Sequence, residues 1–108
     1  MESELLELHN SYRARFQLEE LELDDVLCEY AQAHSNYMER KNRLSHDGFH
    51  DRMQSLNTAI AENVGFSPSA IACFNMWIAS TNHNTNILGK YKRIGVGKKG
   101  NYFTVIFT

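Results

Sequence analysis

Apolar residues recur at helical spacing in the first part of the chain. Between Ser3 and about Leu18 they are Leu5, Leu8, Tyr12 and Phe16. Residues three or four apart share one face of a helix, so the spacing predicts a helix over this segment. Ser3 is its predicted N-cap, because a serine hydroxyl can accept a hydrogen bond from a free backbone N–H group of the first turn.

A second amphipathic segment begins at Asp24 or Asp25 and runs to about Asn42. Either aspartate can cap the first turn of a helix. Its side chains divide into two faces, with Leu27, Ala31, His34 and Met38 on one and Glu29, Gln32, Glu39 and Arg40 on the other. The segment is therefore predicted to be a helix that packs on the core. His34, on the apolar face, is interpreted as a hydrogen-bonded core residue.

A break in the helical pattern and a short strand follow. The run from Leu44 to Phe49 has no helical period, and Gly48 is the predicted turn residue. From Thr58 to Phe66 the pattern favours a strand, because alternate residues point to the same side. One side of this strand carries Ile60, Glu62, Val64 and Phe66. A carboxylate on the same side as three apolar residues is unusual.

The remaining segments predict a helix and a β-hairpin. Ser67 and Pro68 open the helix as its cap and its first residue. Apolar residues lie all round this helix as far as Ile78, which implies burial on several sides. The polar run 82–86 is either a loop or a short helical turn. Two β-rich runs flank the turn 98–101, which indicates a hairpin.

Together these elements indicate an α+β fold with a small, largely antiparallel sheet. The predicted strands of the sheet are Ile60–Val64, Arg93–Gly97 and Tyr102–Phe107. The chain has 108 residues, of which 43% are hydrophobic, and it shows neither an internal repeat nor a linker. One domain over residues 1–108 is therefore predicted.

Composition and charge exclude several classes of protein. The hydrophobic fraction of 43% and the net charge of −2 do not fit a disordered segment. No apolar run approaches the roughly 20 residues of a transmembrane helix. The 11 basic and 13 acidic residues leave no positive field over the whole domain, so nucleic acid is not an expected partner. Cys28 and Cys73 are too few for a disulfide framework and are predicted to be free thiols.

Three residues are candidates for chemistry: His46 before a turn, Glu62 on the strand face and His83 in an Asn-rich segment. Two imidazoles and a carboxylate can bind Zn²⁺ and leave a position open to water, or they can act as general acids and bases. The three residues are not at helical i, i+4 spacing, so the sequence alone does not bring them together. The alternative is separate surface histidines and one isolated acid. His9 and His50 are interpreted as structural or exposed residues.

A basic cluster late in the chain allows two interpretations. Its members are Lys90, Lys92, Arg93, Lys98 and Lys99. The cluster is either the solvated surface of the hairpin or a contact for anions or lipid head groups.

Six short motifs follow one another along the chain. They are Leu8–Arg13, Ala31–Ser35, Leu44–Phe49, Ala61–Val64, Trp77–His83 and Ile94–Gly97. Taken in this order, they resemble the CAP superfamily of cysteine-rich secretory proteins, antigen 5 and plant pathogenesis-related proteins. The likeness covers nearly the whole chain and is greatest to the compact bacterial members. It implies an α-β-α sandwich.

The resemblance also implies a cleft lined by a His-Glu-Glu-His tetrad. His46 matches the first histidine, Glu62 the first glutamate and His83 the last histidine, whereas Ser80 stands where the second glutamate is expected. The set is therefore incomplete, which weakens an enzymatic function. Some members bind Zn²⁺ through the two histidines, and others bind sterols or fatty acids at separate sites. Burial of Glu62 in such a cleft requires a charge partner or hydrogen bonds.

Three functions from different classes follow. The first is a secreted or surface-exposed interaction domain without catalysis, whose partner is an extracellular protein or a small ligand such as a lipid. The second is a domain that binds Zn²⁺ weakly, or a small ligand, through His46 and His83 with Glu62 as a further ligand. The third is a hydrolase that acts through metal-activated water, which needs a carboxylate to accept a proton. No cofactor is required by the fold itself.

The resemblance implies an extracellular or cell-surface location, and a monomer is expected. One form of this location is a surface lipoprotein whose anchor segment lies outside these residues. The first ten residues have neither a basic head nor an apolar stretch, so they are not predicted to be a signal peptide.

Overall fold

Four strands form one mixed sheet in the order β1-β3-β4-β2 in the computed structural model, which describes residues 1–108. β3 (Arg93–Lys99) and β4 (Tyr102–Phe107) form an antiparallel hairpin, and β2 (Ala61–Phe66) pairs antiparallel with β4. β1 (Glu22–Leu23) pairs parallel with β3. Every residue of β4 is buried, because this strand lies in the interior of the sheet and both of its faces are covered. The predicted hairpin and α+β class are confirmed.

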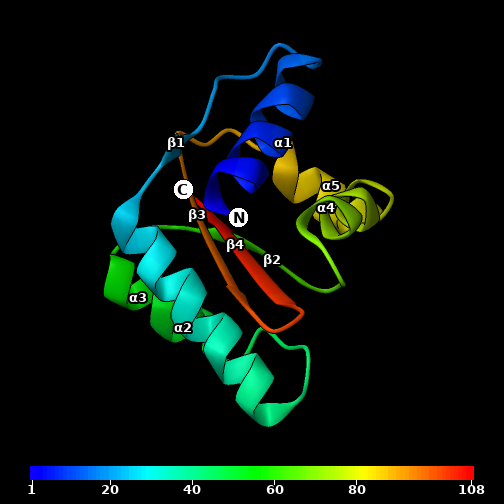
Figure 1. Ribbon diagram of the computed structural model, residues 1–108. Helices are drawn as coiled ribbons and strands as arrows, with labels where there is room; N and C mark the ends of the chain where they lie inside the picture. The colour runs from blue at the N-terminus through cyan, green and yellow to red at the C-terminus, as the bar shows by residue number, and fades with distance from the viewer.

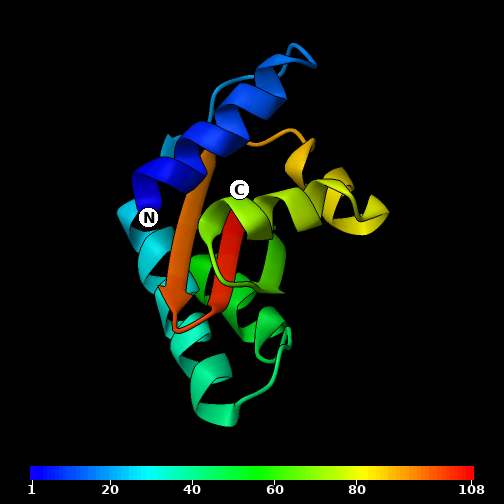
Figure 2. The ribbon, with the colours of Figure 1, turned by 45° about the vertical axis from the view of Figure 1, so that its right-hand side comes forward.

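Helices cover both faces of the sheet (Figures 1 and 2). α2 (Asp25–Lys41) and α3 (Phe49–Leu56) lie on one face, and α1 (Glu2–Ala14), α4 (Ala70–Ile78) and α5 (Thr81–Ile87) lie on the other. Successive side chains of β4 point alternately to the two helical layers. Phe103, Val105 and Phe107 join the core with α1 and α4, whereas Ile106 packs against Leu27 and Ala31 of α2. The result is the α-β-α sandwich that the resemblance implied.

α2 is the element that the sequence predicted most closely. Asp24 is its N-cap, and the carboxylate accepts a hydrogen bond of 2.9 Å from the backbone N–H of Leu27. The helix ends at Asn42, which adopts the left-handed conformation with a φ of 54°. Its predicted apolar face is buried, His34 included. The caps stop the helix where the apolar period also stops, so two local signals agree.

Glycines in β3 allow α2 to approach the sheet closely. A Cβ atom at Gly95 would collide with the backbone of Leu27, and one at Gly97 would collide with the backbone of Ala31 and Gln32. Backbone atoms inside a helix cannot move aside as the tip of a flexible side chain can. The two glycines therefore bring the helix against the strand, where larger residues would push it away.

Replacing Gly97 by alanine is expected to lower the free energy of unfolding by about 1–3 kcal/mol, because the added methyl group overpacks the contact between β3 and α2. Urea denaturation monitored by circular dichroism measures the loss. Lys99→Ala, two residues away and exposed, is the control and should change stability by less than about 0.5 kcal/mol. Equal stabilities of the two variants would contradict the close contact.

Several element boundaries differ from those predicted. α1 ends at Ala14, four residues short of the expected Leu18, and its N-cap is Met1, with no capping bond from Ser3. α4 is capped by Ser69, whose hydroxyl accepts a hydrogen bond of 3.2 Å from the N–H of Ala72. Ser67 and Pro68 thus precede the helix, because the cap that fits the first turn lies two residues further on.

Three further features were not predicted or were predicted differently. Ile71 and Met76 are about half exposed, at 51% and 46%, so α4 is not buried on all sides as expected. α3 and β1 were not predicted at all: no residue of α3 is buried, and β1 is only two residues long. β1 is too short to show a period, whereas Phe49, Met53 and Leu56 of α3 stand at i, i+4 and i+7, a helical period that the prediction overlooked. The polar run 82–86, for which the sequence allowed either a loop or a short helical turn, lies within α5.

Both cysteines lie in the core as free thiols. Cys73 belongs to α4 and Cys28 to α2, and both are buried. Burial raises the pKa of the Cys73 thiol to about 12. This residue is therefore an unreactive core side chain.

Candidate functional site

Glu62 is the buried centre of the site. It lies on β2, a strand at the edge of the sheet, and its side chain has no exposed surface. The Arg52 guanidinium grips the carboxylate with two hydrogen bonds, from Nε to Oε2 at 2.8 Å and from Nη2 to Oε1 at 2.7 Å. His46 donates a further hydrogen bond from Nδ1 to Oε1 at 2.9 Å. Both oxygens of Glu62 are therefore occupied by protein donors.

The ionised form of Glu62 is stabilised despite its burial. Burial by itself would raise the pKa of this carboxyl group. The hydrogen bonds from His46 and Arg52 and the charge of Arg52 act in the opposite direction, and the pKa of Glu62 lies below its ordinary value. Glu62 is thus a carboxylate at neutral pH, held as one half of a buried ion pair.

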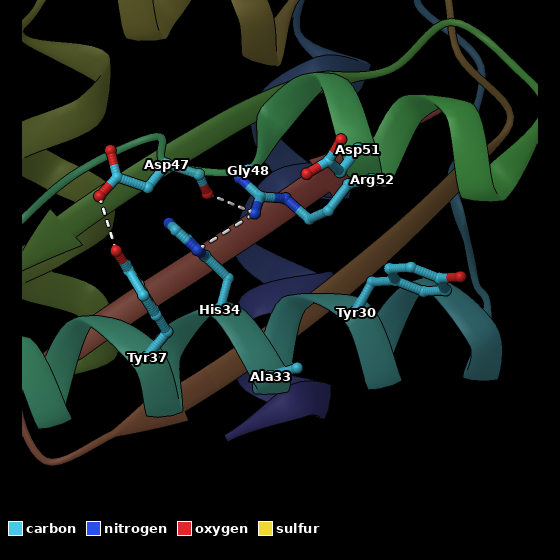
Figure 3. Close-up of a pocket in the computed structure, with 8 residues that line it drawn as sticks. All are labelled: Tyr30, Ala33, His34, Tyr37, Asp47, Gly48, Asp51 and Arg52. Atoms are coloured by element: carbon cyan, nitrogen blue, oxygen red, sulfur yellow. Dashed lines mark hydrogen bonds between the residues drawn. The ribbon is translucent and has the colours of Figure 1, made fainter.

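Arg52 is itself fixed by groups from α2 and from the loop before α3 (Figure 3). Its Nη1 atom donates hydrogen bonds to the carbonyl of Asp47 at 2.7 Å and to Nδ1 of His34 at 3.2 Å. The Nε2 atom of His34 lies 2.6 Å from the carbonyl oxygen of Ser45 and must donate to it. His34 is therefore the neutral tautomer with its proton on Nε2. Burial, together with the charge of Arg52, holds the pKa of His34 below its ordinary value.

A pocket of about 440 Å³ opens between α2 and the start of α3, behind this network. Tyr37 of α2 closes one end, where its hydroxyl donates a hydrogen bond of 2.8 Å to Asp47 (Figure 3). Arg43 donates to the same carboxylate oxygen at 2.7 Å, across an exposed ion pair. The bond from Tyr37, together with the contact between Arg52 and His34, fixes the segment 46–52 on α2, so the backbone that carries His46 and Arg52 is held in place beside Glu62.

His83 and Ser80 form the other side of the cleft. Ser80 precedes α5 and His83 lies in its first turn, with the hydroxyl of Ser80 and Nδ1 of His83 sharing a hydrogen bond of 2.9 Å. Burial and the nearby His46 lower the pKa of His83. A hollow of about 380 Å³ is lined by His46, Ser80 and His83, and also by Ser45 and by apolar side chains that include Leu44, Met76 and Trp77. The two histidines therefore face one shared space.

The structure divides the predicted site residues between two neighbouring hollows. His46 lines both, Ser80 and His83 line the first, and Glu62 lines the second, which has a volume of about 420 Å³. No group of three or more His, Cys, Asp or Glu side chains is placed to hold a metal ion. The arrangement thus offers two imidazole rings to a ligand, with the acid behind one of them.

Arg52 is the site residue that sequence reasoning missed. The available signal was the requirement of a buried carboxylate for a charge partner, since Glu62 stood on an otherwise apolar strand face. Arg52 lies on a short amphipathic segment ten residues before Glu62, and no fixed spacing in the sequence marks it as the partner of this carboxylate. Asn63 and Asn86 were also missed. The Asn86 amide donates to Asn63 at 2.9 Å, and Asn63 donates to the carbonyl of His83 at 3.1 Å, which ties α5 to β2.

The other histidines lie outside the site. His9 is completely buried in α1 and His50 is exposed on α3. Both fit the structural or exposed roles that were predicted for them. No helix of the structure combines the length and apolar character needed to cross a membrane.

The three-layer fold and a cleft with two histidines beside a buried glutamate define an α-β-α domain of the class that the sequence motifs indicated. The chain belongs to the CAP family, the cysteine-rich secretory protein family, whose model matches residues 6–107. No curated protein sequence matches the chain.

Solved structures with this fold come from several bacteria. An extracellular protein containing an SCP domain from Bacillus anthracis is 27% identical, with a TM-score of 0.89 over 97% of this chain and 39% of its own. A cysteine-rich secretory protein from Staphylococcus aureus is 21% identical, with a TM-score of 0.84 over 96% of this chain and 36% of its own. An outer surface protein from Borrelia burgdorferi is 20% identical, with a TM-score of 0.86 over 97% of this chain and 89% of its own. The chain therefore spans less than two fifths of the length of the first two proteins.

Proposed function

We propose that this chain is a non-catalytic binding domain of an extracellular or cell-surface protein, with the cleft between His46 and His83 as its ligand-contacting face. The observation that carries the proposal is the state of Glu62. Both of its oxygens are engaged by Arg52 and His46, and its side chain is fully buried. A carboxylate in this state does not accept a proton from a water molecule in the cleft.

The remaining polar groups support the same conclusion. Ser80 occupies the place of a second acid, and its hydroxyl is paired with His83. A serine nucleophile needs a histidine base that a third group orients, and the Nε2 atom of His83 has no hydrogen-bond partner in the protein. Ser80 is therefore not activated as a nucleophile, and Glu62 is not free to act as a general base.

The surroundings of the cleft suit a partner with an apolar part. Leu44 and Met76 line the hollow and are 45% and 46% exposed. Two of the similar structures are described as an extracellular protein and an outer surface protein, which supports the same location for this chain. We place it there as a monomeric domain of residues 1–108, free or anchored as a lipoprotein, with an extracellular protein or a small ligand such as a lipid as its partner.

The test of this proposal is the hydrolysis of a chromogenic ester and of a fluorescent casein substrate, with and without added Zn²⁺. We expect no turnover above that of Glu62→Gln, in which the candidate base is removed. Turnover that the wild-type protein shows and that Glu62→Gln and His46→Ala both lose would overturn the proposal in favour of a metal-assisted hydrolase.

A second candidate function, weak Zn²⁺ binding through His46 and His83, rests on the orientation of the two rings. Each ring uses Nδ1 for a protein hydrogen bond, with Glu62 and with Ser80, and each Nε2 atom is without a protein partner. A hydrogen bond at one ring nitrogen is how proteins orient a histidine whose other nitrogen binds a metal ion. This donor set fits an ion held by two imidazoles and solvent, and it requires no cofactor for folding.

Replacing His46 or His83 by alanine is expected to abolish Zn²⁺ uptake while changing the thermal midpoint by only a few degrees. Uptake should also fade as the pH falls, because protons compete with the metal ion for the imidazole nitrogens. Isothermal titration calorimetry at pH 7.5 and pH 5.5 measures both effects. His50→Ala, an exposed histidine outside the cleft, is the matched control and should bind Zn²⁺ like the wild type. Undiminished uptake in His46→Ala and His83→Ala would mean that the ion binds elsewhere.

A further inference from the structure

Arg13 is a buried cation without an acidic partner. It is 1% exposed, and no carboxylate lies within ion-pair distance of it. Its guanidinium is held by backbone carbonyls alone: Glu19 accepts from Nε at 3.1 Å and from Nη2 at 3.0 Å, and Ile87 and Gly89 accept from Nη1 at 2.8 and 2.7 Å. A guanidinium has five N–H groups, so one N–H of Nη2 has no acceptor. Carbonyl dipoles satisfy hydrogen bonds but leave the positive charge uncompensated.

A pocket of about 360 Å³ lies directly beside this guanidinium. One wall is the segment after α1, and the other is the segment that leads into β3, with Lys90, Tyr91 and Lys92. Both segments lie at the same end of the molecule (Figures 1 and 2). Lys90 and Lys92 are exposed and form no ion pair. Three cationic side chains therefore surround the pocket, against a single carboxylate, that of Glu19.

Tyr91 adds a neutral donor to the same pocket. Its ring stacks on Phe107, with 5.1 Å between the ring centroids and 20° between the planes, so its position is fixed. Tyr91 lines the pocket with Arg13, and its hydroxyl, which lies beside Gly89, has no hydrogen-bond partner in the protein. Burial raises the pKa of Tyr91, which keeps the O–H group protonated and able to donate.

We infer that this pocket binds a small oxyanion, the carboxylate or phosphate group of a ligand, between Arg13, Tyr91 and the ammonium groups of Lys90 and Lys92. Charge-assisted hydrogen bonds to an anion are the strongest that such donors can make. The anion would accept the free N–H of Arg13 and the hydroxyl of Tyr91, and it would compensate the buried charge. The site lies apart from the cleft and does not depend on its function.

The basic cluster of the C-terminal region divides into residues that line this pocket and residues that do not. Lys98 and Lys99 lie at the far end of β3, beside the hairpin turn, and line no part of this pocket. Arg93 is directed to Asp24, at 3.6 Å. Only Lys90 and Lys92 belong to the site, so position rather than total charge distinguishes it.

The experiment is a titration of ¹⁵N-labelled protein with sodium phosphate, acetate and glycerol phosphate, at an ionic strength kept constant with chloride. We expect saturable shifts of the Arg13 Nε–H resonance and of the backbone amides near Glu19 and Tyr91. Glycerol phosphate represents a lipid head group. Sedimentation with vesicles of phosphatidylglycerol or phosphatidylcholine then tests whether the protein binds such a head group in a membrane. Binding to the soluble phosphates with no difference between the two vesicles would identify a free anion as the ligand, whereas preference for phosphatidylglycerol would identify a head group.

Four variants make the test specific. Lys90→Ala/Lys92→Ala should weaken phosphate binding about tenfold, and Tyr91→Phe, which keeps the stacking, about threefold. Glu19→Gln should strengthen binding by about twofold, because it removes the one opposing charge and keeps the backbone carbonyl. Lys98→Ala/Lys99→Ala removes the same charge at the other end of the strand and should leave binding unchanged.

Two results would overturn the inference. One is an equal loss of binding in the two double variants, which would show a general effect of net charge. The other is shifts that do not saturate or that spread over all lysines, which would show an adventitious ion only. Either result leaves the proposal for the cleft untouched.

Discussion

Replacing Arg52 by methionine is expected to lower the free energy of unfolding by about 3–5 kcal/mol at pH 7, because it leaves the Glu62 carboxylate buried without a counter-charge. Glu62 has no exposed side-chain surface, and the hydrogen bond from His46 cannot replace two bonds from a guanidinium. Methionine keeps much of the length and volume of the arginine stem, so the loss of stability is due to the removal of the charge and not to a cavity. Urea denaturation followed by tryptophan fluorescence measures it.

Two further variants separate the buried charge from other effects. Arg43→Met removes an arginine from the exposed pair with Asp47 and should cost no more than about 1 kcal/mol. Adding Glu62→Gln to Arg52→Met should restore part of the loss, since a neutral amide is less costly to bury than a lone carboxylate. A loss in Arg52→Met no larger than that in Arg43→Met would contradict the structural role assigned to the buried pair.

The same pair has a defined dependence on pH. The pKa of Glu62 is lowered from the ordinary value of 4.5 in the folded protein, so the unfolded chain takes up the proton first as the pH falls. The stability that the pair contributes is therefore complete above about pH 5 and is lost as the pH falls through the folded-state pKa. We expect the difference between the wild type and Arg52→Met to shrink over this acidic range.

Acidification from pH 6.5 to pH 4 is expected to remove roughly 3 kcal/mol of stability through His9 alone. Burial lowers the pKa of His9 from 6.5 to about 4, with the charge of Arg13 acting in the same direction and the hydrogen bond to Leu5 opposing it. The unfolded chain binds the proton near pH 6.5 and the folded chain only near pH 4. This contribution is therefore fully present above pH 6.5 and falls progressively below it.

The environment of His9 explains why its charged form is so unfavourable. The Nδ1 atom lies 2.7 Å from the Leu5 carbonyl and donates to it, and Nε2 is the buried side-chain nitrogen without a partner. Its ring packs among Phe74, Trp77 and Phe107, with centroids 4.9–6.1 Å away. Protonation would place an N–H group and a charge among three aromatic rings with no acceptor.

His9→Met, which removes the titrating group from the core, should flatten the dependence of stability on pH between 6.5 and 4. Urea midpoints at four pH values over this range provide the measurement. His34, whose pKa is also lowered by burial, leaves a residual slope in the same direction. His50→Gln serves as the control and should keep the full wild-type slope, because His50 is exposed. The same slope in His9→Met as in the wild type would contradict the role of His9.

The sequence by itself determined those elements whose signals are local. α2 was predicted with its cap at Asp24 or Asp25 and its end at about Asn42, and the hairpin of β3 and β4 was predicted from two β-rich runs and a glycine-containing turn. Period, caps and turn residues act over a few positions, so they can be read without knowledge of the fold. Family motifs extended this to the layers of the sandwich. They also implied one cleft for His46, Glu62 and His83, whereas the structure has two neighbouring hollows, both lined by His46, with His83 in one and Glu62 in the other.

Only the tertiary structure decided how the site works. Glu62 meets Arg52 because α3 lies against α2: Leu56 packs beside Leu27 and Ala31, and Tyr37 donates a hydrogen bond to Asp47 in the loop before α3. Arg13 and Lys90 approach one pocket from segments more than seventy positions apart. Such pairs have no fixed spacing in the sequence, because they are brought together only when the helices pack on the sheet. Whether a buried charge has a partner is therefore decided by the tertiary structure.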